Sequence, residues 1–334
     1  MYKKHIVPYE ICTPLLSFAA AFALIAWLAR SRWARFALDH PNRRSLHDVP
    51  VPRSGGLGIL LGIAIACIIV GGGVAILLWP GLVLLAVVSF IDDIRGVNVG
   101  IRLLTQLVAA GTVAAGAVYP DFGVGAAVVF VLGTTWMANL YNFMDGSDGL
   151  AGGMALFGFL FYGMVAWLAG AEDYALLNFS IAAAAAAFLI FNFHPARIFM
   201  GDAGAVPLGF LAAALGVIGW ERHYWFWWFP FLVFSPFIVD STVTLARRAL
   251  RRERIWEAHK DHYYQRLVRM GWGHRNTALA EYALMLSCGM AAFAALASSP
   301  ATQASVIAAA VLAYFTLARA VDRAWLRFDA RASA

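Results

Sequence analysis

Charged side chains are scarce in this sequence. Only 13% of its 334 residues are Asp, Glu, Lys or Arg, and 62% are hydrophobic, whereas about a quarter of a soluble domain is charged. This composition excludes a soluble globular protein and predicts one embedded in a membrane. Cysteine is also rare, because only Cys12, Cys67 and Cys288 occur, far apart and in apolar stretches. Their spacing excludes a disulfide framework or a thiolate metal site and predicts three small core residues.

Hydrophobic runs long enough to cross a bilayer recur along the whole chain. The first run lacks a small-residue cleavage site, so we expect a retained helix rather than a signal peptide. The sequence therefore predicts an all-α, polytopic membrane protein that forms a single integral-membrane domain over residues 1–334. We count about eleven spans, at 10–30, 55–71, 74–91, 100–118, 122–140, 149–169, 174–193, 203–219, 224–246, 277–298 and 303–321.

Lys and Arg residues are divided unevenly between the two sides of the predicted membrane. If the N-terminus lies outside, 22 of the 25 fall on the inner side, and only Lys3, Lys4 and Arg222 fall outside. Because inner loops carry the excess of Lys and Arg, we predict an N-out, C-in orientation. The net charge of +6 thus reflects topology rather than nucleic-acid binding. Two long cytoplasmic loops are expected, at about 31–54 and 247–276.

Acidic residues recur at the inner ends of the apolar runs. Asp92 and Asp93 end one run, Asp145 and Asp148 end another, and Asp202 begins a third. A carboxylate near hydrocarbon is costly and rarely lies there without a partner or a function. Five at matching depth predict one site for a hard cation and a phosphorylated substrate. The competing explanations are helix-end charge for the first pair, an Asp-Gly turn for the second, and helix capping by the last.

A basic segment precedes a glycine-rich stretch. Arg43, Arg44, His47 and Arg53 come before Gly55 and its neighbouring glycines. Arginine side chains bind phosphate, and glycines let backbone amides approach it. The first two arginines are equally well explained as topology signals.

Two histidines, His259 and His262, stand three residues apart in the second long loop. With one nearby Asp they offer too few ligands for zinc, which favours contact with phosphate or sugar over a metal site. A merely solvated basic loop is the competing explanation. Asp240, near the inner end of span 224–246, is expected to pair with an arginine of this loop.

Taken together, these segments resemble one family, the polyprenyl-phosphate N-acetylhexosamine-1-phosphate transferases of glycosyltransferase family 4. The family includes enzymes that start O-antigen and teichoic acid synthesis, and the peptidoglycan lipid I synthase. The similarity covers most of the chain in order. Its matching segments are Arg53 to Gly56, Asp92-Asp93, Arg102 to Gln106, Asn139 to Ala151, Asn192 to Gly204 and the region of His259 and His262.

The resemblance implies transfer of a HexNAc-1-phosphate from a UDP-sugar to undecaprenyl phosphate, with release of UMP. It places the protein in the bacterial inner membrane with its active site facing the cytoplasm, where it would start O-antigen or another cell-envelope polysaccharide. It implies Mg²⁺, with Mn²⁺ as an alternative, held by Asp202 and Asp93. The implied catalytic residues are Asp92, Asp93 and Asp202, with Asp92 as the base. A one-step and a covalent two-step mechanism both stay open.

The resemblance and the motifs together also predict the substrate-binding residues. They are Arg53, Asn139, Asn142, Asp145, Asp148, Phe199, His259, His262 and Arg266. The histidine pair lacks the dense clusters of the lipid I and GlcNAc enzymes, and its continuation is similar to enzymes that use 6-deoxy sugars such as FucNAc or QuiNAc. The sugar, the pathway and a homodimeric state stay open.

Two other classes of protein are weighed against an enzyme. Intramembrane acids and a basic loop would also suit a proton-coupled transporter. No inverted repeat is visible, however, and the acids lie at helix ends rather than in mid-span. The second alternative is a structural scaffold, but in such a protein the acids would have no function.

Overall fold

The structure is a computed structural model that describes residues 12–31, 37–39, 41, 46, 49–254, 257 and 259–332. Arg43, Arg44 and His47 lie outside the described residues. The helices, in chain order, are α1 Thr13–Arg30, α2 Gly55–Val70, α3 Gly72–Arg95, α4 Val99–Val113, the π-helix η3 Ala114–Val118, α5 Tyr119–Phe143, α6 Leu150–Leu168, α7 Glu172–Asn192, α8 Asp202–Glu221, α9 Trp228–Val233, α10 Ser235–Leu250, α11 Tyr263–Leu267, the π-helix η4 Val268–Trp272, α12 Gly273–Ala295 and α13 Pro300–Ala332.

Eight stretches of the described chain are long and apolar enough to cross a membrane. One of them, Val99–Phe143, contains α4, η3 and α5, and its backbone breaks at Gly123. The 16-residue helix α2 is apolar but shorter than the others. The prediction of an all-α, polytopic membrane protein is therefore confirmed, while the count of about eleven spans and the orientation stay predictions.

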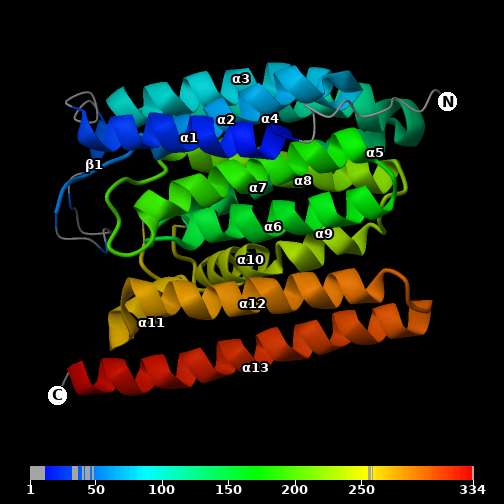
Figure 1. Cartoon of the computed structure of the whole chain (residues 1–334). Helices are drawn as coiled ribbons and strands as arrows, with labels where there is room; N and C mark the ends of the chain where they lie inside the picture. The colour runs from blue at the N-terminus through cyan, green and yellow to red at the C-terminus, as the bar shows by residue number, and fades with distance from the viewer. Residues whose placement is uncertain are drawn as a thin grey trace.

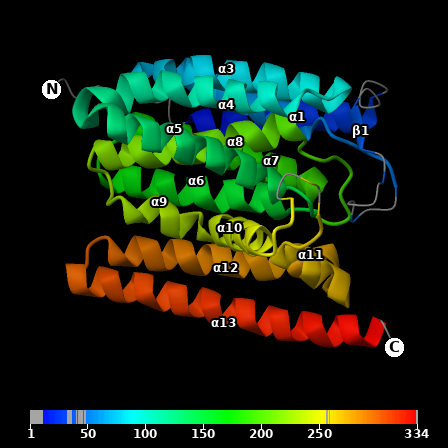
Figure 2. The same cartoon turned by 180° about the vertical axis from the view of Figure 1, so that it is seen from behind.

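The long helices lie side by side in one elongated bundle (Figure 1). The innermost helix is α8, which packs against α3 and α5 and is buried over 83% of its most apolar stretch. Helix α13 lies at the edge and packs against α12 and α11, and none of its most apolar stretch is buried (Figure 2). Because lipid is as apolar as leucine, we expect these exposed hydrophobic side chains to face the bilayer.

Glycines let α2 and α8 approach closely at one end of the bundle. The Gly55 and Gly56 N–H groups donate to the Phe199 and Met200 carbonyl oxygens, both at 2.9 Å. A Cβ atom on Gly56 would lie 2.4 Å from the backbone nitrogen of Gly204. The expectation that these two amides face phosphate is therefore wrong, because they fasten α2 to the segment that enters α8.

Several predicted boundaries also need correction. The span 224–246 is two helices, α9 and α10, which meet at Phe234 before Pro236 in the first turn of α10. Proline lacks an N–H and suits a helix start. The loop 247–276 is largely helical, because α10, α11, η4 and α12 occupy most of it. The last helix continues past residue 321 to Ala332.

Two smaller features complete the fold. Strands β1 (Leu38–Asp39) and β2 (Val51–Pro52) pair antiparallel, with Leu38 opposite Pro52, beside the start of α2. All three cysteines are free, and Cys67 and Cys288 are buried as predicted. Cys12 is exposed, so its assignment to the core is wrong, because it lies just before the first residue of α1.

Candidate active site

One end of the bundle contains a cavity of about 680 Å³. The C-terminal ends of α3 and α5, the N-terminus of α8, the β1–β2 hairpin and the segment before α11 surround it. β1 and α11 lie at the same end of the bundle in both views (Figures 1 and 2). Ten predicted site residues line this one cavity, namely Arg53, Asp92, Asp93, Asn142, Asp145, Asp148, Phe199, Asp202, His259 and His262.

Asp93 caps helix α8 from the neighbouring helix α3. Its Oδ1 accepts a hydrogen bond from the Asp202 N–H at 3.0 Å, and its Oδ2 accepts one from the Ala203 N–H at 2.9 Å. The first amides of a helix lack intrahelical partners, and negative charge beside them is favourable. The competing explanation that Asp202 itself caps α8 is therefore wrong. The α8 cap position is Gly201, and the Asp202 side chain lines the cavity.

Arg102, on α4, lies between two of the predicted catalytic acids. Its Nη1 is 2.8 Å from Asp92 Oδ2 and 3.5 Å from Asp202 Oδ2. The other Asp92 oxygen accepts a hydrogen bond from the Val97 N–H at 2.5 Å. One guanidinium thus offsets the repulsion between two close carboxylates. The sequence resemblance covered Arg102 but gave it no role, although a cation ten residues after Asp92 at a helix start was a usable signal.

Asn142 and Asp145 reach the same place from α5. Asn142 lies in the last turn of the helix, next to the Asp202 carboxyl, and Asp145 follows the helix end. Loss of hydration on burial, helped by the carboxylates of Asp202 and Asp93, raises the pKa of Asp145 well above its ordinary value. A carboxyl that keeps its proton can donate a hydrogen bond, which an ionised one cannot.

Asp148 joins separate segments of the cavity wall. Its Oδ2 is 2.6 Å from His194 Nδ1 and 3.1 Å from the Ala196 N–H. His274, at the start of α12, stacks on His194 with ring centroids 5.6 Å apart and bonds Ser147 Oγ at 2.9 Å. Asp148 is therefore engaged with protein groups as well as lining the cavity. Neither histidine is among the predicted site residues, although each flanks an apolar run as the acids do.

Asn139 and Arg266 do not line the cavity. The Asn139 Nδ2 group donates to Gln106 Oε1 at 2.6 Å and to the Thr135 carbonyl oxygen at 2.8 Å, so it joins α5 to α4. Arg266 Nη1 pairs with Asp322 of α13 at 3.1 Å. The structure thus gives both residues packing partners instead of a position among the cavity side chains.

The histidine pair has one unexpected partner. His262 Nδ1 lies 3.1 Å from Asp240 Oδ1, so the expected pairing of Asp240 with an arginine is wrong among the described contacts. Burial, with the charges of His262 and Arg248, lowers the pKa of His259 to about 4. In the described part of the chain, no three His, Cys, Asp or Glu side chains form a ready-made metal site.

Comparison with known proteins agrees with this geometry. A model of the family described as glycosyl transferase family 4 matches residues 75–220, which contain the α3, α5 and α8 ends of the cavity. A probable undecaprenyl-phosphate N-acetylglucosaminyl 1-phosphate transferase of Bacillus subtilis is 29% identical over 264 residues, or 74% of each chain. A decaprenyl-phosphate N-acetylglucosaminephosphotransferase of Mycobacterium tuberculosis is 29% identical, covering 83% of this chain and 80% of its own.

A more distant kind of relative matches as well. A phospho-N-acetylmuramoyl-pentapeptide-transferase of Shouchella clausii is 28% identical, covering 77% of this chain and 88% of its own. Fold, cavity and similarity together define a polytopic membrane transferase. The chain is similar to glycosyl transferase family 4 and, within it, to the polyprenyl-phosphate N-acetylhexosamine-1-phosphate transferases.

Proposed function

We propose that this protein transfers a HexNAc-1-phosphate from a UDP-sugar to undecaprenyl phosphate and releases UMP. The reaction would take place at the cytoplasmic face of a bacterial inner membrane and would start O-antigen or another cell-envelope polysaccharide. The names of the relatives support a polyprenyl phosphate acceptor and an N-acetylhexosamine donor.

The observation that carries this proposal is the charge of the cavity. Two arginine side chains, Arg53 and Arg102, face six acidic side chains among the described lining residues, besides Asp145, which keeps its proton. The six are Asp39, Asp92, Asp93, Asp148, Asp202 and Glu257. Arg53 is already paired with Asp39 at 2.9 Å and Arg102 with Asp92. A donor diphosphate and an acceptor phosphate would be repelled here unless a further cation entered with them.

The residues present fit a magnesium ion. Mg²⁺ is commonly held by one or two carboxylates together with water and substrate phosphate oxygens, rather than by an all-protein cage. Asp202 and Asp93, which both line the cavity, would supply the carboxylates. When bound, the ion would neutralise charge on the donor diphosphate.

The side chains around the acids account for the rest of the reaction. An oxygen of the acceptor phosphate forms a bond to the β-phosphorus of the donor. The bond from that phosphorus to the bridging oxygen breaks, and UMP leaves with that oxygen. Asp92 would accept the acceptor's proton, while the Val97 N–H and Arg102 hold its carboxylate in place. Phe199 and Asn142 would contact the uridine.

The cavity also has an apolar side that suits a lipid acceptor. Ile94 and Phe143 both line it, although 41% and 39% of their surfaces are exposed. Both residues lie at the ends of predicted membrane helices, α3 and α5. A prenyl chain in the bilayer could therefore remain in hydrocarbon while its phosphate enters the cavity.

The donor sugar would be selected by the segment that carries His259 and His262. Part of this region departs from the GlcNAc-specific pattern, and the sugars we favour are 6-deoxy types such as FucNAc or QuiNAc. Replacing residues 257–266 with those of a GlcNAc-specific relative should shift the ratio of turnover efficiencies for the two donor types. An active chimera with an unchanged ratio would place selectivity elsewhere.

Direct assay tests the proposed function. Purified protein is incubated with undecaprenyl phosphate, Mg²⁺ and a panel of UDP-HexNAc donors, and UMP release is measured. We expect release with at least one donor, loss after exhaustive chelation, and recovery on adding Mg²⁺ or Mn²⁺. Absence of UMP with every donor would contradict the reaction, and full activity after chelation would contradict the cation.

A further inference from the structure

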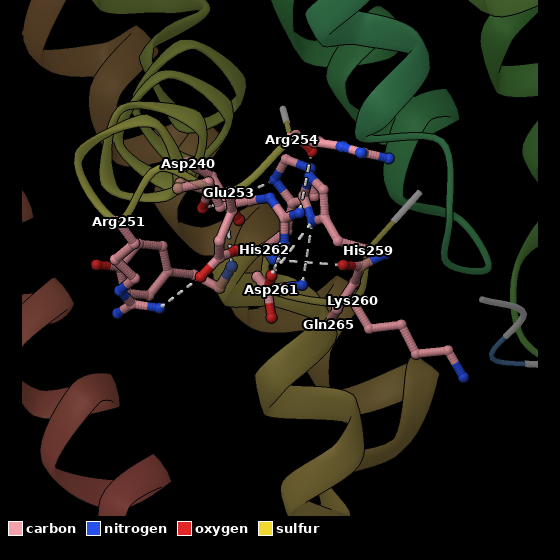
Figure 3. A network of polar contacts seen from close by, with 12 residues as sticks. Asp240, Arg251, Glu253, Arg254, His259, Lys260, Asp261, His262 and Gln265 are labelled. Carbon is pink, nitrogen blue, oxygen red and sulfur yellow. Dashed lines mark hydrogen bonds and ion pairs between the residues drawn. The ribbon is translucent and has the colours of Figure 1, made fainter. Parts of the chain in front are cut away.

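Asp240 holds the segment that begins α11. This buried carboxylate on α10 accepts four hydrogen bonds. Its Oδ1 accepts from Thr244 Oγ1 at 3.1 Å, from His262 Nδ1 at 3.1 Å and from the Tyr263 N–H at 3.0 Å. Its Oδ2 accepts from the Tyr264 N–H at 3.1 Å. Three of the four donors belong to consecutive residues, and Figure 3 shows Asp240 beside the His262 ring.

The partner of His262 fixes which ring nitrogen carries the proton. A carboxylate flanked by backbone N–H donors can only accept, so the His262 Nδ1 must donate to it. Because Nδ1 is occupied by Asp240, Nε2 is the ring nitrogen left for a ligand in the cavity that His262 lines.

His259 has the opposite arrangement. The Asp261 N–H donates to His259 Nδ1 at 3.3 Å, so this nitrogen has no proton. The Asp261 carboxylate is 3.8 Å away, beyond hydrogen-bond range, and is paired with Arg248. A pKa of about 4 keeps the His259 ring neutral near pH 7. The proton is therefore on Nε2, which donates hydrogen bonds.

The structure assigns Asp240 as a positioning residue that holds His262 by its Nδ1 atom, so that the Nε2 atom of His262 lies beside the donor on His259. Their ring centroids lie 4.9 Å apart, which is close enough for both to contact one small group. This inference rests on the proposed function. The group it fits is one that accepts a hydrogen bond from His259 Nε2, such as the N-acetyl carbonyl oxygen or a hydroxyl of the HexNAc.

Tyr264 fixes the histidine pair relative to the acids. Its hydroxyl donates to the Phe143 carbonyl oxygen at 3.1 Å, at the end of α5. The Phe143 ring also stacks on His262, with centroids 6.4 Å apart. Phe143 lies between Asn142 and Asp145 in the chain, so the sugar-facing pair and the predicted uridine-facing residues share one rigid support.

A double-mutant cycle tests the inference. Asp240→Asn, His262→Ala and the double variant are assayed with undecaprenyl phosphate and the best UDP-HexNAc donor from the panel. The Asn side chain keeps one acceptor oxygen. Its NH2 group replaces the other carboxylate oxygen and would face hydrogen-bond donors there, with which it cannot pair. Thr244→Val is the matched control, because it removes the one side-chain donor to Asp240 that does not belong to the histidine segment.

We expect Asp240→Asn and His262→Ala each to lower kcat/KM for the donor by about 10- to 100-fold, as when a residue that orients a histidine is lost. The double variant should lose little beyond either single variant. The KM for undecaprenyl phosphate should be unchanged, and Thr244→Val should stay within about twofold of the unsubstituted protein.

Several outcomes would overturn the inference. Additive losses in the cycle, or equal rises in KM for donor and acceptor, would mean that Asp240 acts only through general folding. An unchanged kcat/KM in His262→Ala would remove the sugar contact, and this arm remains decisive if Asp240→Asn does not fold. A wild-type protein inactive with every donor would refute the proposed function and the inference together, whereas an active wild type with unaffected variants would refute the inference alone.

Discussion

Replacing Asp93 should separate its structural role from its role in the reaction. The side chain accepts two hydrogen bonds from the first amides of α8, at 3.0 and 2.9 Å. Losing a helix cap costs about 0.5–2 kcal/mol, and the interaction of a carboxylate with a helix N-terminus adds up to about 2 kcal/mol. Repulsion from the neighbouring Asp202 offsets part of this, so we expect Asp93→Ala to cost about 2 kcal/mol.

The assay is thermal unfolding in detergent, together with UMP release. For a chain of this size, about 2 °C of Tm accompanies each kcal/mol, so Asp93→Ala should lower Tm by about 4 °C. Asp93→Asn keeps one acceptor and should lose about half as much. Asp173→Asn, an acid in the first turn of α7, is the control and should stay within about 0.5 kcal/mol. If Asp93→Ala is inactive but its Tm is unchanged, the capping role is refuted and Asp93 acts only as a ligand of the metal ion.

The remaining predictions concern the acids, one histidine and the topology. Asp92→Asn and Asp202→Asn should each lower turnover at least ~100-fold at an unchanged Tm, and near-normal turnover in both would contradict the assignment. The raised pKa of Asp145 means that the folded state loses stability as pH rises from about 4 toward that pKa, by about 1.4 kcal/mol per unit of pKa difference. Asp145→Asn should therefore raise Tm at neutral pH while lowering activity, and an unchanged or lower Tm would count against it. The pKa of about 4 for His259 leaves stability unaffected above pH 6.5 and lowers it as pH falls from 6.5 to 4, so His259→Gln should flatten this acid limb in pH-dependent melting curves. Lys260→Cys should resist labelling by an impermeant reagent added outside intact cells, and labelling there would reverse the predicted orientation.

The class of protein was predictable because it depends on composition and local pattern. A chain with 62% hydrophobic residues in long runs can satisfy its backbone in lipid only as helices or as a closed barrel. The cavity acids were predictable for a similar reason. Asp92 and Asp145 end or follow an apolar run and Asp202 begins one, and the cost of a charge at that depth marks them as functional.

The assignment of roles among those acids needed the tertiary structure. The sequence alone does not distinguish Asp93 from Asp202, since each is an acid at one end of an apolar run. Both carboxylates line the cavity. Only the packing of α3 against α8 shows that Asp93 caps α8, whereas Asp202 lies beside Arg102. In the same way, only the fold pairs Arg266 with Asp322, which lies on a helix more than fifty residues later, and places it outside the cavity lining.

The sequence by itself therefore determined that this is a helical membrane protein with acids at the ends of its apolar runs, because hydrophobicity and charge act residue by residue. The tertiary structure decided which partner each polar group has. Hydrogen bonds depend on distances of about 3 Å between residues that are distant in the chain. Asp240 and His262 are 22 positions apart, and no spacing in the sequence required the carboxylate of one to fix the proton of the other.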